Sequence, residues 1–71
     1  MSRIALAIDL GGTELRAGLV GEDGAVAALE AEPTRATAGP DVVIAQMLAL
    51  GRRVMAARPD LPPLGVGVGA P

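Results

Sequence analysis

The sequence lacks Phe, Tyr, Trp, Cys and His, and all six of its basic residues are Arg, so Lys is missing as well. Without cysteine, neither a disulfide nor a thiolate zinc site can stabilise the fold. The absence of histidine removes the commonest metal ligand and the commonest general base at neutral pH. The core must therefore come from aliphatic side chains, which bury less area per residue than aromatic ones do.

The length of 71 residues allows one small domain at most. A core of small aliphatic side chains gives such a short chain little buried surface. We therefore expect residues 1–71 to be an incomplete N-terminal domain, with the remainder of the protein absent from this sequence.

The net charge is −2, and the six Arg residues are scattered along the chain. Nucleic acid is not an expected partner, because affinity for the phosphate backbone needs clustered basic residues. No apolar run approaches the roughly 20 residues of a membrane span. Only five apolar residues precede Asp9, too few for a signal peptide. We expect a cytoplasmic protein without a membrane partner.

The first half of the sequence predicts three strands. Residues 4–8 are continuously apolar, which is typical of a strand buried on both faces in the middle of a sheet. Residues 14–19 alternate between apolar and other side chains, as in a second strand. Asp23-Gly24 is a turn signal before a third strand over 26–32. That strand carries Glu30 and Glu32, so we expect it near a sheet edge.

The second half predicts a helix and a fourth strand. Pro40 and Asp41 suit the first turn of a helix, which ends before Pro59. Its core stripe has helical spacing and consists of Val43, Met47, Leu50 and Val54. Three late arginines are expected to complement the negative end of the helix dipole: Arg52, Arg53 and Arg58. In the strand over 64–69, glycines occupy one whole face, which suggests that a backbone or ligand comes close.

These elements give the order β-β-β-α-β. Short links favour antiparallel pairing of the first three strands, and a right-handed helical crossover lets the fourth run parallel to the first. The predicted fold class is therefore α/β, with a mixed sheet.

The segment Asp9-Leu10-Gly11-Gly12-Thr13 joins the first two predicted strands. Gly11 and Gly12 lack Cβ atoms, so their backbone N–H groups can approach a phosphate closely. Thr13 can donate its hydroxyl, and Asp9 can hold Mg²⁺, which prefers oxygen ligands and keeps several waters. The alternative is an ordinary Gly-Gly hairpin in which Asp9 is only a turn residue.

Arg16 is a further candidate for phosphate binding, and two other nucleotide-binding motifs can be tested against the sequence. Arg16 can reach a phosphate, or it can pair with Glu14 or Glu30 on a solvated strand face. A P-loop is excluded because its signature needs a lysine. The glycines of residues 67–71 do not suit a dinucleotide-binding turn, because Pro71 lies where a helix should begin. Asp60 and Glu22 are expected to be solvated loop charges.

The stretch IALAIDLGGTELRAGLV, followed by Asp-Gly, a helix and LGVGVGAP, resembles the N-terminus of the ROK (repressor, open reading frame, kinase) family of sugar kinases. That family belongs to the actin-like ATPase superfamily, which includes hexokinase. The resemblance covers essentially this whole chain but well under half of a family member. It implies part of a ribonuclease-H-like domain.

The resemblance also assigns roles to individual residues. It places Asp9 near Mg²⁺ and brings Gly11, Gly12 and Thr13 to the phosphates of ATP. Arg16 occupies the arginine position of the hexokinase pattern D-L-G-G-T-x-x-R, so the resemblance adds it to the ATP-binding residues. Family members often carry Lys at the position where this chain has Glu14. The resemblance also implies that the loop formed by residues 69–71 borders a sugar cleft.

The implied whole protein is an ATP-dependent hexose kinase, most simply a glucokinase, with ATP and a hexose as partners. The same resemblance leaves open an N-acetylhexosamine or N-acetylmannosamine kinase, or a non-catalytic sugar-responsive regulator. Only three residues precede the first strand, without room for the helix-turn-helix of repressor members, which favours a kinase. A structural zinc and a homo-oligomer are both compatible with the family.

The family's catalytic aspartate, its zinc ligands and its sugar-binding Glu-x-Gly-His all belong downstream of residue 71. We therefore assign no catalytic residue and no zinc ligand to this sequence, and we expect the 71-residue chain alone to be inactive.

Overall fold

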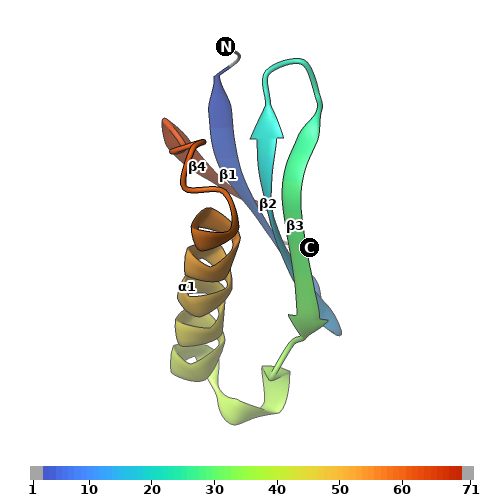
Figure 1. Ribbon diagram of the computed structural model, residues 1–71. Helices are drawn as coiled ribbons and strands as arrows, with labels where there is room; N and C mark the ends of the chain where they lie inside the picture. The colour runs from blue at the N-terminus through green and yellow to red at the C-terminus, as the bar shows by residue number, and fades with distance from the viewer. Residues whose placement is uncertain (1–2, 70–71) are drawn as a thin grey trace.

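A computed structural model describes residues 3–69 of the chain. In it the chain forms four strands and one long helix (Figure 1). The elements are β1 (Ile4–Leu10), β2 (Glu14–Gly21), β3 (Val26–Pro33), the short 3-10 helix η1 (Ala36–Ala38), α1 (Pro40–Ala57) and β4 (Gly65–Gly69). The predicted order β-β-β-α-β is confirmed.

The four strands make one mixed sheet in the order β3-β2-β1-β4. Both hairpins pair antiparallel, whereas β4 returns through α1 to lie parallel to β1. The short turns leave the chain no room for any other pairing of the first three strands, and the helix supplies the long crossover that a parallel neighbour requires. This is the βββαβ arrangement of ribonuclease-H-like folds, and it confirms the predicted fold class.

The hydrophobic core lies between α1 and one face of the sheet. Leu6 and Ile8 of β1 point to this face, as do Leu15, Ala17 and Leu19 of β2, and they meet Leu50 and Val54 of α1. At Gly51 the helix comes so close to β1 that a Cβ atom would lie 3.3 Å from the Leu6 Cδ2. The predicted helical stripe is thus confirmed as core at Leu50 and Val54, and Met47 packs partly buried against them, whereas Val43 lies outside this cluster.

The opposite face of the sheet carries no helix in residues 3–69, which corrects the expectation for β1. That strand was predicted to be buried on both faces, yet Ala5, Ala7 and Asp9 are exposed. Their small or polar side chains alternate with Leu6 and Ile8, and α1 covers only the latter. The continuous apolar run of β1 therefore belongs to a strand that is buried on one face only.

The two edge strands differ in how they meet α1. β3 packs on the helix, and Arg53 reaches across to Glu30 and Glu32 at 3.3 and 3.9 Å. β4 makes no packing contact with α1, so Val66 and Val68 stay exposed although they lie on the helix side of the sheet.

The charges at the end of α1 correct one expectation. The helix ends at Ala57, and no basic residue lies in its last turn, so Arg52 and Arg53 do not act on its dipole. Arg58 follows the helix and forms an ion pair at 2.9 Å with Asp60, which is an exposed loop charge as predicted. No helix within the described residues is both long and apolar enough to cross a membrane.

Candidate functional site

The turn between β1 and β2 contains two glycines with different structural roles. The Gly11 N–H donates to the Glu14 carbonyl oxygen at 2.9 Å, closing the hairpin. A Cβ atom at position 11 would lie 2.7 Å from that same oxygen, closer than real Cβ atoms come. Gly11 is therefore required by the turn itself, as the plain hairpin interpretation expects.

Gly12 has no such structural requirement. No atom lies within 4 Å of the position that a Cβ would take there, and the φ angle of Gly12 is not positive. Within residues 3–69 its N–H group makes no hydrogen bond, and neither does the N–H of Thr13. Of the two glycines in this turn, Gly12 is thus the one that the turn geometry does not require, and it lies in open space beside two backbone donors without a partner in residues 3–69.

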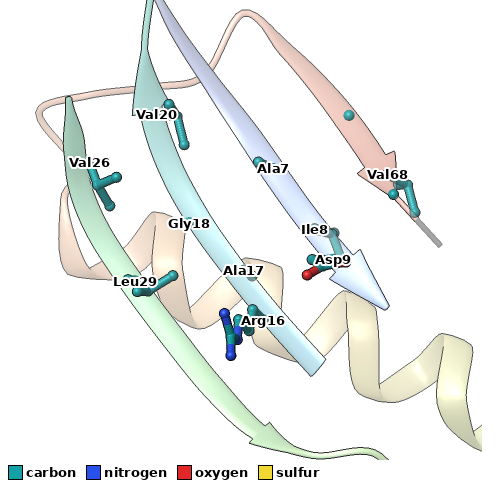
Figure 2. A pocket seen from close by; sticks show the side chains of 12 residues that line it. Ala7, Ile8, Asp9, Arg16, Ala17, Gly18, Val20, Val26, Leu29 and Val68 are labelled. Carbon is teal, nitrogen blue, oxygen red and sulfur yellow. The ribbon is translucent and has the colours of Figure 1, made fainter. Parts of the chain in front are cut away.

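Asp9 lies beside this turn, on the sheet face opposite α1 (Figure 2). It is exposed, pairs across the ladder with Arg16 on one side and lies next to Gly69 on the other. A Cβ atom at Gly69 would lie 3.9 Å from the Asp9 Oδ1. Because β1 and β4 are parallel, Asp9, the turn and the end of β4 meet at the same end of the sheet.

Arg16 shares the face of Asp9, but its guanidinium is engaged by Glu14. The Arg16 Nε donates to the Glu14 Oε1 at 2.6 Å, and both side chains are about half exposed. This hydrogen bond and the charge of Glu14 raise the pKa of Arg16, with a smaller contribution from Asp9. Pairing with Glu14 is therefore confirmed, whereas Glu30 pairs with Arg53 instead.

The Arg16 guanidinium can still bind an anion while Glu14 holds its Nε. Within residues 3–69 its two terminal guanidinium nitrogens make no hydrogen bond. Arg16 lines the same shallow hollow as Asp9, so the structure brings a guanidinium group and a carboxylate to one place.

That hollow has a volume of about 470 Å³ and runs along the open sheet face. Its floor is made of small residues on three neighbouring strands, among them Gly18 of β2, Ala7 of β1 and Gly67 of β4. Asp9 and Arg16 are its charged residues, and Figure 2 shows both side chains at one end, near the tip of β1. The hollow is apolar along its length and polar where the turn begins.

Asp9 is the one predicted metal ligand, and its surroundings fit a single-carboxylate Mg²⁺ site. Residues 3–69 contain no group of three acidic side chains that could hold a metal alone. Mg²⁺ is commonly bound by one or two carboxylates, with phosphate oxygens and waters completing its shell. An exposed carboxylate beside open N–H donors is compatible with that arrangement, in which phosphate oxygens and waters are most of the ligands.

Two residues that the sequence analysis did not select also build the site. Thr34 contacts the turn, and Gln46 of α1 holds the segment around Thr34. Gln46 is 7% exposed although polar. The sequence does contain a signal for the burial of Gln46. It follows Val43 by three residues and precedes Leu50 by four, which is the spacing of the core stripe.

The remaining predicted feature is the sugar-side loop. Gly69 is the last residue of β4, and the rest of that loop, Ala70 and Pro71, lies outside the described residues. No protein-family model matches this chain, and no curated protein matches its sequence significantly.

Proposed function

We propose that this chain supplies the ATP phosphate-binding loop of an ATP-dependent hexose kinase of the ROK family, with glucokinase as the leading candidate. Asp9, Gly12, Thr13 and Arg16 supply its contacts to ATP, and Gly11 shapes the turn that presents them, because its own N–H donates to the Glu14 carbonyl oxygen. The hexose-binding residues and the catalytic base belong to the rest of the protein.

The observation that carries the proposal is Gly12. A glycine that is needed neither for its φ angle nor for lack of space weakens a hairpin without any structural gain. Its N–H and that of Thr13 lack partners within the described residues, and backbone donors of this kind bind phosphate oxygens well. Close approach of a ligand explains the absence of a side chain there.

Asp9 and Arg16 supply the charges that phosphoryl transfer needs. A bound Mg²⁺ would neutralise negative charge on the phosphate oxygens and hold them in place. Asp9 would orient that ion, directly or through water, and Arg16 could contact an outer phosphate oxygen while Glu14 holds its Nε. Thr13, exposed at the end of the turn, adds a hydroxyl donor.

The decisive experiment is a substrate screen of the longer protein that this proposal assumes. We expect ATP-dependent phosphorylation of glucose, and no phosphorylation by the 71-residue chain alone. Turnover of N-acetylhexosamine or N-acetylmannosamine in preference to glucose would assign one of the alternative kinases. Sugar binding without any turnover would overturn the kinase and favour the regulator.

A further inference from the structure

Thr34 touches the turn at two points, on either side of Gly12. Its Oγ1 donates to the Gly11 carbonyl oxygen at 3.0 Å, and its N–H donates to the Thr13 carbonyl oxygen at 3.1 Å. Thr34 follows β3 directly, so it comes from outside the β1–β2 hairpin. Both carbonyl groups that flank Gly12 are thereby tied to a neighbouring segment.

The bond to Gly11 fixes the direction of the Gly12 N–H. In a trans peptide the carbonyl of one residue and the N–H of the next lie in one plane and point in opposite directions. The described residues contain no cis peptide bond. Because the Gly11 carbonyl points to Thr34, the Gly12 N–H must point away from it, out of the turn.

The position of Thr34 is itself set by α1. The Gln46 Nε2 donates to the Pro33 carbonyl oxygen at 2.7 Å, and the Gln46 Oε1 accepts from the Arg35 N–H at 3.1 Å. These bonds hold the residues immediately before and after Thr34. A buried helix side chain thus anchors the segment that orders the turn.

We propose that Thr34 is a positioning residue of the phosphate loop, acting through the Gly11 carbonyl to aim the Gly12 N–H at a phosphate group. The inference rests on the function proposed above, because it assumes a phosphate ligand. Thr34 does not touch that ligand. Its hydroxyl fixes the direction of the Gly12 N–H before binding, so the loop loses less conformational entropy when the nucleotide binds.

The test compares three variants of the 71-residue chain by NMR. Thr34→Val removes the hydroxyl and keeps the shape, and Thr34→Ser keeps the hydroxyl. Thr37→Val makes the same exchange at an exposed threonine of η1 that has no hydrogen bond within residues 3–69. Hydrogen exchange is measured at the amide of Gly11, and chemical shifts of the Gly12 amide are followed during titration with MgATP.

We expect Thr34→Val to speed exchange at Gly11 and to raise the Kd for MgATP, each by roughly two- to tenfold, the effect of one lost neutral hydrogen bond. Thr34→Ser should restore both values, and Thr37→Val should change neither. Unchanged exchange at Gly11 in Thr34→Val would overturn the role of Thr34, as would equal acceleration at every amide of β2, which indicates global destabilisation. No response of the unmodified chain to MgATP at Gly12 would instead overturn the phosphate role itself.

Discussion

At the scale of single residues, the site rests on a contrast between two adjacent glycines. The hairpin needs Gly11, because its N–H closes the turn and any side chain would meet the Glu14 carbonyl oxygen. Gly12 has open space around it and an ordinary φ angle. A purely structural Gly-Gly turn explains the first glycine and leaves the second without a reason.

Exchanging each glycine for alanine separates these roles. Gly11→Ala should lower the free energy of unfolding by about 1–3 kcal/mol, because its Cβ has to displace backbone. Gly12→Ala should leave the stability unchanged or raise it by about 0.4–1 kcal/mol, since alanine restricts the unfolded chain. Urea unfolding measures both, and a MgATP titration should show weaker binding for Gly12→Ala. Full MgATP affinity in that variant would argue against a close phosphate.

Asp9 offers a second test at this scale, in the longer protein. Asp9→Asn keeps the size of the side chain and removes its charge, so Mg²⁺ loses an orienting partner. We expect kcat for sugar phosphorylation to fall by about 10- to 100-fold, the usual cost of losing such a partner. Stability should not change, because the Asp9 side chain is exposed and makes no hydrogen bond within residues 3–69.

Glu22→Gln is the matched control for Asp9→Asn, since Glu22 lies just after β2, at the far end of the hairpin. It should retain full turnover. If Asp9→Asn also kept its turnover at saturating Mg²⁺, the proposed metal role of Asp9 would have to be abandoned.

At the scale of the elements, α1 does more than cover the core. Its buried stripe packs on β1 and β2, Arg53 reaches the acidic residues of β3, and Gln46 holds the segment after β3. The last turn carries no basic residue, and the cation near this end, Arg58, lies outside the helix. Arg58 donates from Nε and from a terminal nitrogen to the two carboxylate oxygens of Asp60, at 3.0 and 2.9 Å.

This pair predicts a pH dependence confined to acid. The hydrogen bonds from Arg58 hold the pKa of Asp60 below its usual value. A lowered folded-state pKa means that the pair stabilises the fold above the unfolded-state value of about 3.9. That contribution is lost as the pH falls through the lower, folded-state value.

An NMR titration of the Asp60 carboxyl carbon checks the expectation. Its midpoint should lie below that of an ordinary aspartate, and Arg58→Gln should raise it back. Arg52→Gln serves as the control, because Arg52 makes no ion pair within residues 3–69. An Asp60 midpoint that Arg58→Gln does not move would show that the pair does not persist in solution.

At the scale of the whole molecule, what the sequence could predict was set by local signals. Asp23-Gly24 forms the expected turn, with Gly24 at φ +87°, and short links and one helical crossover define the strand order. The coverage of β1 could not be predicted, because Ala5 and Ala7 are apolar enough for a buried face. The contact of Thr34 with Gly11 joins residues 23 positions apart, so no local pattern contains it.

The uncovered sheet face leads to the last prediction, which compares two leucines. Leu19 of β2 is fully buried against α1, whereas Leu29 of β3 pairs with Gly18 on the open face and is 62% exposed. Leu19→Ala should lower the free energy of unfolding by about 2–5 kcal/mol, through lost burial and a cavity. Leu29→Ala should change it by no more than about 0.5 kcal/mol, as is usual for a surface position.

Urea unfolding of the 71-residue chain at several protein concentrations measures both variants under the same conditions. A small chain with one covered face has little stability to lose, so Leu19→Ala should leave most of the chain unfolded. If Leu29→Ala instead cost more than about 1 kcal/mol, well above a surface effect, the open face would have to be covered in solution. Concentration-dependent unfolding would then identify a second copy of the chain as the cover, and the hollow beside Asp9 would be closed in the free protein.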